Sequence, residues 1–213
     1  MIEFLKKYFI SRKEKRLKKK FNHLYKKFVP QILSDINALE AGNDLLVKLH
    51  GSGAKSVIID SILFYKYAIL DIVGLANIWT NTNQAEENLI VRLLAGTLYE
   101  FLDDSRYFLS KKFRVKMAAM PYSERYLYEF DNIADIFRLI NDEFLKMLGD
   151  IRNNTAFHKS KDPRIFKKVK DDINEVHFGQ VVLSTFYLWI KINKFHRLFL
   201  NCILEYEKDK QHK

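Results

Sequence analysis

The segment from Asp150 to Ser160 combines residue types that can act together on a phosphate ester. It contains Arg152, Asn153 and His158 within seven consecutive positions. On an uninterrupted helix the arginine and the histidine would point about 600° apart, or about 240° net, and would not face one site. Asparagine tolerates the left-handed conformation that ends many helices. We therefore expect the helix to turn or end between Arg152 and His158.

These two side chains suit the metal-free cleavage of a phosphodiester. A guanidinium stays protonated and binds phosphate oxygens, while the imidazole of histidine ordinarily has a pKa of about 6.5. His158 would act as general base on a ribose 2′-hydroxyl or as general acid on the leaving oxygen, and Arg152 would stabilise charge on the phosphorus centre. The pattern leaves a structural alternative open, in which Arg152 caps helix carbonyls and His158 fills a turn.

One further segment resembles a phosphate-binding loop only superficially. In the sequence from His50 to Ser56, Ala54 separates Gly53 from Lys55, and a helix is expected before the loop. A phosphate loop requires a Gly-Lys pair between a strand and a helix. We interpret this segment as a plain loop.

The remaining polar motifs do not predict a metal or cofactor site. Adjacent carboxylates such as Asp103 and Asp104 point about 100° apart on a helix, which favours a solvated face over an acid–base pair. The six histidines lack the close spacing to each other or to acids that is typical of metal sites. Cys202 is the only cysteine, which excludes an internal disulfide and favours a reducing, cytoplasmic setting.

The composition favours an all-α fold. The chain has 213 residues, of which 48% are apolar, enough for one domain with a sizeable core. Only 7 glycines and 3 prolines leave few sites for the tight turns of an all-β fold. We predict a bundle of about five to six long helices. Their expected ranges are 4–28, 31–49, 54–79, 84–113, a fifth helix from a cap at Ser123 and Glu124 to about residue 151, and 178–207.

Two of these helices show informative apolar patterns. The fifth carries a seam with alternating spacings of three and four residues, which predicts packing against a neighbouring helix or another subunit. The seam consists of Phe130, Ile133, Phe137, Ile140, Phe144, Met147 and Ile151. The segment 56–79 is the most apolar, but it contains Asp60, Lys66 and Asp71, so we interpret it as a buried core helix and not a membrane span.

The positive charge is concentrated at the amino-terminal end. Residues 1–30 contain eleven Lys and Arg against two Glu, a net charge of +9, whereas the other residues carry 25 basic against 24 acidic groups. Pro30 is expected to separate this arm from a single helical domain over 31–213. The arm could attract RNA, bind an anionic membrane surface, or pack its apolar stripe on the bundle. The candidate RNA-binding residues are Lys13, Arg16, Lys18, Lys19 and Lys20, together with Lys159 near the histidine.

The motif and its helical context resemble the HEPN superfamily (higher eukaryotes and prokaryotes nucleotide-binding). Its signature is an arginine, a polar residue and a histidine a few positions later, at the end of a long helix in an all-α bundle. Arg152, Asn153 and His158 match it, and the resemblance covers about 84–207. The sequence from Val91 to Asp103 is also similar to the helix that packs beside the motif helix in abortive-infection-like members.

The resemblance implies a metal-independent endoribonuclease without a cofactor, with Arg152, Asn153 and His158 as catalytic residues. Such proteins are commonly homodimers whose two motifs line one cleft, and many are toxins or phage-defence effectors with an antitoxin or regulatory partner. In one subgroup a tyrosine two positions after the histidine is modified, and here that position is Ser160. Some members bind nucleic acid or nucleotides without cleaving, so a non-catalytic binding module that uses the basic arm stays open as the alternative.

Overall fold

The computed structural model describes residues 2–50, 54–82, 84–153 and 175–211, and within these ranges it is all-α. This confirms the predicted fold class. The helices are α1 (Ile2–His50), α2 (Ala54–Asn81), α3 (Gln84–Phe108), α4 (Lys111–Ala118), α5 (Leu127–Ile151) and α7 (Glu175–Gln211), with a short 3₁₀ turn, η1, at Ser123–Arg125.

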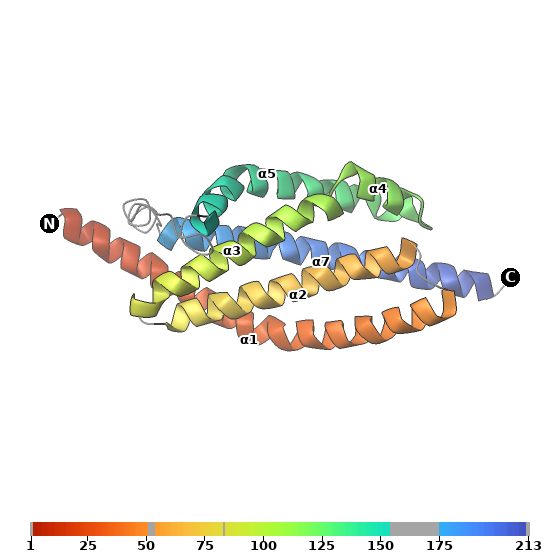
Figure 1. Ribbon diagram of the computed structural model, residues 1–213, viewed down its shortest axis with the longest axis horizontal. Coiled ribbons are helices and arrows are strands. Elements are labelled where there is room, and N and C mark those ends of the chain that lie inside the picture. Colours follow the sequence, from red (N-terminus) through yellow and green to blue (C-terminus); the bar gives the residue numbers. More distant parts are fainter. Residues whose placement is uncertain (1, 51–53, 83, 154–174, 212–213) are drawn as a thin grey trace.

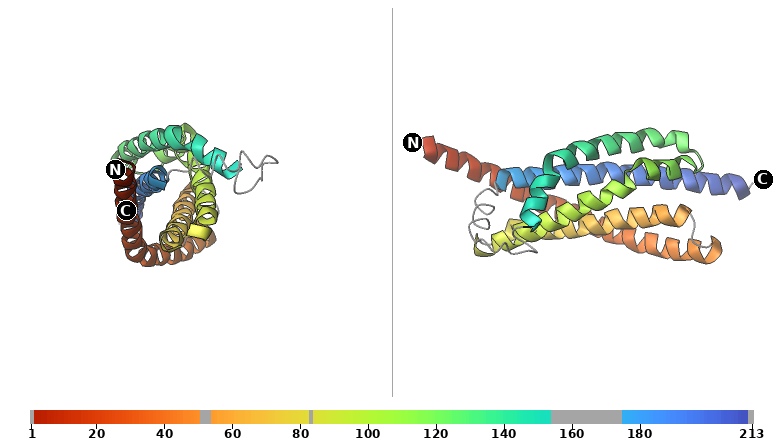
Figure 2. Two further views of the ribbon diagram at one scale, coloured as in Figure 1. Left: turned by 90° about the vertical axis from the view of Figure 1, so that its left-hand side faces the viewer. Right: turned by 45° about the horizontal axis from the view of Figure 1, so that its top comes forward.

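The five long helices form a closed bundle (Figure 1). Viewed along the bundle, α1, α2, α3, α5 and α7 follow one another around a ring, and α7 packs against α1, α2 and α5 (Figure 2). The first turns of α1 project beyond the other helices at one end, and the last turns of α7 project at the opposite end (Figures 1 and 2). The basic arm, residues 1–30, thus begins outside the bundle and continues into it.

The core consists of aliphatic and aromatic side chains from all five long helices. The predicted seam of α5 is buried at Phe130, Ile133, Phe137, Ile140, Phe144 and Ile151. Met147 is only half-buried, and the adjacent Leu148 is fully buried in its place. Since α5 packs on α3 and α7, the seam faces neighbouring helices of the same chain.

The predicted helix break at Pro30 is wrong, because α1 continues through this residue. Proline removes one helical hydrogen bond and its ring crowds the carbonyl one turn earlier, which ordinarily costs about 3 kcal/mol. Contacts on both sides of the proline offset this cost. Phe28 packs against the core before Pro30, and Ile32 and Ile36 are buried after it.

Two other helix boundaries differ from the prediction. The helix expected over 84–113 ends at Phe108, and a new helix, α4, starts behind Ser110. The Ser110 hydroxyl accepts a hydrogen bond from the Phe113 backbone N–H at 3.2 Å, an N-cap that competes with helix continuation. Ser123 lies in η1 and does not cap α5, which begins at Leu127.

Among the described residues, none of the helices combines the length and the apolar character that crossing a lipid bilayer requires. The segment 56–79 lies in α2, where Ile62, Ile69 and Ile72 are almost completely buried within the bundle. Its interpretation as a core helix is confirmed.

Candidate functional site

Arg152 lies where α5 stops being a regular α-helix. α5 ends at Ile151, and Arg152 and Asn153 continue the chain in a wider, π-helical turn. The Arg152 backbone N–H still donates to the carbonyls of Leu148 and Gly149. Single π-type turns in helices are frequent at functional sites.

The neighbouring helix α3 holds the Arg152 side chain. The guanidinium carbon lies 5.0 Å from the centre of the Tyr99 ring, within the range of a cation–π interaction. One terminal nitrogen donates to Glu100 Oε1 at 3.4 Å. Gly149 permits the close packing of the two helices, because a Cβ at this position would lie 3.2 Å from Tyr99 Cε2. The arginine is thereby held over an aromatic ring, with 33% of its side chain exposed.

The same face of α3 carries several carboxylates. Asp103 and Asp104 follow Glu100, and Asp103 forms an ion pair with Arg106 at 3.2 Å. Burial raises the pKa of the Asp104 carboxyl, and the negative charges of Asp103 and Glu100 raise it further. A phosphate that approaches Arg152 would therefore meet negative charge on α3 and must replace Glu100. The Glu100 ion pair is long and exposed, so its loss costs at most about 1 kcal/mol.

The structure brings only part of the predicted site together. Arg152 and Asn153 lie side by side at the end of α5, and the Asn153 side chain is exposed. His158 and Lys159 lie outside the described residues, so the distance between the histidine and the arginine stays a prediction. Lys13, Arg16, Lys18, Lys19 and Lys20 all lie on α1. Among these, Arg16, Lys19 and Lys20 have exposed side chains.

The basic segment and the end of α5 share one end of the molecule. The amino-terminal turns of α1 and the carboxyl end of α5 both lie toward the same end of the bundle in two different views (Figures 1 and 2). A polyanion attracted by α1 would therefore arrive at the end that carries Arg152.

Comparison with models of protein families, with curated proteins and with solved structures gives no match for this chain. Functional arguments therefore depend on its own residues. Within the described ranges, no cluster of three or more His, Cys, Asp or Glu side chains could hold a metal ion.

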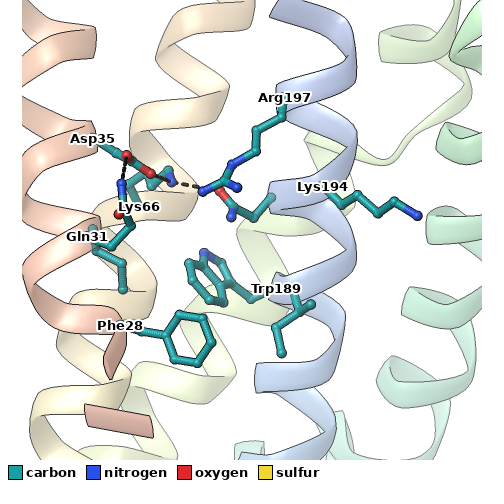
Figure 3. Close-up of a pocket in the computed structure, with 10 residues that line it drawn as sticks. Phe28, Gln31, Asp35, Lys66, Trp189, Lys194 and Arg197 are labelled. Atoms are coloured by element: carbon teal, nitrogen blue, oxygen red, sulfur yellow. Dashed lines mark hydrogen bonds and ion pairs between the residues drawn. The ribbon is translucent and has the colours of Figure 1, made fainter. Parts of the chain in front are cut away.

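A second polar site lies between α1, α2 and α7, and sequence reasoning missed it (Figure 3). Lys66 on α2 is buried, with 5% of its side chain exposed. Its ammonium donates to Asp35 Oδ2 on α1 and to Asn193 Oδ1 on α7, the latter at 2.7 Å. Gln31 donates to the other oxygen of Asp35 at 2.7 Å. One buried cation thus joins three helices.

The pKa shifts of this pair reflect its burial. Burial lowers the pKa of Lys66, and the hydrogen bond to Asp35 offsets only part of that effect. Burial also raises the pKa of Asp35, but the hydrogen bonds from Lys66 and Gln31 outweigh it, so the pKa lies below its ordinary value. The positive charge of Arg197 acts in the same direction on both groups.

His196 on α7 is buried, and it lies close enough to this site for the Lys66 charge to act on it. Its ring lies 5.6 Å from that of Tyr65 and 5.7 Å from that of Phe195. Burial, with a smaller effect of the Lys66 charge, lowers its pKa to about 3. The folded protein therefore holds this imidazole neutral at pH 7.

The sequence contained one signal of the second site. Lys66 interrupts the most apolar segment of the chain, and a lysine buried on a core helix requires a partner. Its partners Asp35 and Asn193 are 31 and 127 residues away, so only the tertiary structure identifies them.

Proposed function

We propose that this protein is a metal-independent endoribonuclease of the HEPN type, acting in the cytoplasm. The observation that supports the proposal best is the placement of Arg152. Its guanidinium lies over Tyr99 at the point where α5 leaves regular helical geometry, and it keeps solvent contact. A positioned and partly exposed arginine is suited to bind a phosphodiester in the orientation needed for reaction.

The proposed reaction is an attack of the ribose 2′-oxygen on the adjacent phosphorus. His158 takes the 2′-hydroxyl proton and the new P–O bond forms. The bond to the 5′-oxygen breaks as that oxygen takes a proton from water, and His158 then releases its proton to solvent. Arg152 moves from Glu100 to the phosphate and stabilises the extra negative charge in the transition state. The products are a 2′,3′-cyclic phosphate and a 5′-hydroxyl end.

Single substitutions test this assignment in the presence of EDTA. We expect Arg152→Ala and His158→Ala each to lower RNA cleavage by about 100-fold or more, since each removes a group that acts in the transition state. Arg138→Ala is the matched control, because Arg138 is an exposed arginine of α5 that pairs with Asp135. Circular dichroism checks that all variants keep their helical content. Cleavage that survives both substitutions, or equal cleavage of DNA, would refute the mechanism.

A cellular role as a toxin or phage-defence effector is part of the proposal. Expression of wild type and His158→Ala side by side, scored for growth arrest and RNA integrity, tests it. Toxicity confined to wild type supports the role, and equal toxicity contradicts it. Size-exclusion chromatography with light scattering tests the proposed homodimer, and co-expression with candidate regulatory proteins tests for an antitoxin.

The exposed basic face of α1 favours a second candidate, a binding module without catalysis. Arg16, Lys19, Lys20, Lys26 and Lys27 all have exposed side chains. Contacts of this kind with a polyanion release counterions, so binding weakens steeply with salt. A surface of anionic lipid would attract the same residues.

RNA binding and membrane binding can be separated by testing one pair of variants against both RNA and anionic vesicles. We expect the triple change Arg16→Gln, Lys19→Gln, Lys20→Gln to weaken RNA binding and to reduce the salt slope by up to about three. The control replaces three exposed lysines of α4 with glutamine, namely Lys111, Lys112 and Lys116. Salt-dependent RNA binding that weakens in the triple variant, without RNA cleavage, favours the binding module. Binding to anionic vesicles but not to RNA would favour the membrane alternative.

A further inference from the structure

A cavity of about 260 Å³ lies beside Lys66, between α1, α2 and α7 (Figure 3). One part of its wall is apolar and consists of Phe28, Ile32 and Ile190. The other part is polar and contains Lys66, Asn193 and Arg197. The cavity is therefore amphipathic, as expected for a site that binds an organic ligand with one charged group.

Two hydrogen-bond donors lie at this cavity, the Trp189 indole N–H and the Arg197 guanidinium. Trp189 is 2% exposed as a whole residue, and it lines the cavity. Figure 3 shows its nitrogen-bearing edge turned toward the polar end, where Lys66 and Arg197 lie. A buried indole N–H usually has a hydrogen-bond acceptor. An acceptor supplied by a ligand would satisfy it.

The second donor is the Arg197 guanidinium. It reaches from α7 toward Asp35 and Lys66 (Figure 3), close enough for its charge to act on both. Arg197 is an exposed residue, and both oxygens of Asp35 already accept hydrogen bonds, from Lys66 and from Gln31. Lys66 and Arg197 against Asp35 leave a net charge of +1, and Lys194 adds a further positive charge at the rim. The polar end therefore attracts an anion.

The apolar end limits what can carry that anion. Phe28 and Ile32 form a wall beside the indole, and the Phe28 ring lies 5.8 Å from that of Trp189. Aromatic and aliphatic walls favour a planar or apolar body. A phosphate carries a charge of about −1.5 to −2 near pH 7 and accepts several hydrogen bonds, which matches the surrounding donors better than a carboxylate does.

We propose that this cavity binds a small organic phosphate with a planar body, of the chemistry of a nucleoside monophosphate. The phosphate lies at Arg197 and the Trp189 N–H, and the base lies against Phe28 and Ile190. The same chemistry has two sources, a free mononucleotide or one unpaired nucleotide of an RNA strand. The exposed Lys26 and Lys27 precede Phe28 on α1, so a strand that follows α1 would reach the cavity. The site uses helices other than those that hold Arg152 and does not depend on the proposed nuclease activity.

Calorimetric titration of the full chain tests the proposal. The probes are the 5′-nucleoside monophosphates, the matching nucleosides, and a short 2′-O-methyl oligoribonucleotide, which resists cleavage by 2′-oxygen attack. We expect Arg197→Gln to weaken binding by about 10-fold or more and Trp189→Phe by about 3- to 10-fold, because each removes a donor to the phosphate. Arg138→Gln on α5 removes an exposed arginine outside the cavity and should leave affinity within about 2-fold.

The outcomes distinguish a free nucleotide from an RNA strand as the ligand. They also distinguish failure of the cavity proposal from failure of the proposed nuclease activity. Arg197-dependent binding of a monophosphate identifies a free nucleotide as a ligand, and Arg197-dependent binding of the oligonucleotide alone identifies a strand. Either result should persist in Arg152→Ala, which removes the nuclease site only. The proposal is overturned if no probe shows Arg197-dependent binding, or if nucleosides bind as tightly as their monophosphates. Thermal unfolding of each variant, followed by circular dichroism, verifies that the comparison is between folded proteins.

Discussion

The Arg152 guanidinium lies 5.0 Å from the centre of the Tyr99 ring, and the same ring contacts Gly149, one turn before the arginine. Tyr99 is thus in contact with the helix at one position and with the side chain at another. It fixes the arginine relative to α5 and to α3 at once. A positioning role of this kind predicts an effect of Tyr99 on catalysis that exceeds its effect on folding.

Tyr99→Leu keeps an apolar side chain beside Gly149 but removes the cation–π interaction. We expect RNA cleavage to fall by about 2- to 5-fold, which corresponds to the usual strength of this interaction near a surface. Tyr107→Leu is the matched control, because Tyr107 also lies on α3 and faces a cation, Lys116, at 5.7 Å. An equal loss in both variants would indicate general destabilisation of α3 and contradict the positioning role.

The buried pair of Lys66 and Asp35 predicts a non-additive effect on stability. Asp35→Ala leaves the ammonium buried with only Asn193 as partner, and we expect a loss of about 3 kcal/mol in the free energy of unfolding. The further change Lys66→Met removes the unpaired charge and should recover most of that loss. Urea unfolding of the single and double variants measures both. A double variant less stable than Asp35→Ala would show that Lys66 stabilises the fold even without Asp35, and would contradict the expected recovery.

His196 predicts how stability changes with pH. Its pKa is about 3 in the folded protein against an ordinary value of 6.5, so between these values only the unfolded chain binds the proton. Stability is therefore complete above about pH 6.5 and falls as the pH decreases, by at most about 1.4 kcal/mol per pH unit. We expect His196→Gln to flatten this dependence between pH 7 and pH 5 in urea unfolding. Parallel curves for wild type and variant would exclude His196 as the cause.

Pro30 predicts a gain in stability on substitution. Pro30→Ala restores the hydrogen bond to the carbonyl of Lys26 and removes a steric conflict within α1, so we expect a gain of about 1–3 kcal/mol in urea unfolding. Asn37→Ala, at an exposed position of the same helix, controls for helix propensity alone. A loss of stability in Pro30→Ala would mean that the path of α1 across α2 and α7 requires the proline.

The periodicity of apolar residues predicted where most of the helical segments lie, including α2, α5 and α7. Apolar residues that recur every three or four positions lie on one face of a helix, and the buried faces of α2, α5 and α7 follow that pattern. The prediction was least accurate where a 3.5-residue repeat departs from the 3.6-residue period of a straight helix. Met147 was expected in the seam, but a straight helix turns by about 20° per heptad relative to a 3.5-residue repeat, and Leu148 is buried in its place.

Local sequence signals were also insufficient to predict helix boundaries where other interactions in the folded chain oppose them. Pro30 is a strong helix breaker by itself, yet the burial of Ile32 and Ile36 beyond it keeps α1 continuous. At Ser110 the opposite holds, because one capping hydrogen bond ends a helix that the apolar pattern would have extended. Sequence reasoning weighs such effects residue by residue, whereas the folded chain depends on their sum.

The sequence by itself determined the all-α class, the concentration of charge in residues 1–30, and the position of Arg152 at the end of a long helix. These properties follow from composition and from spacing along the chain. Only the tertiary structure decided that Tyr99 and Glu100 hold Arg152, and that Lys66 joins Asp35 and Asn193 beside an amphipathic cavity. Those contacts connect residues that are far apart in the chain. Their partners are selected by how the helices pack, which no local pattern encodes.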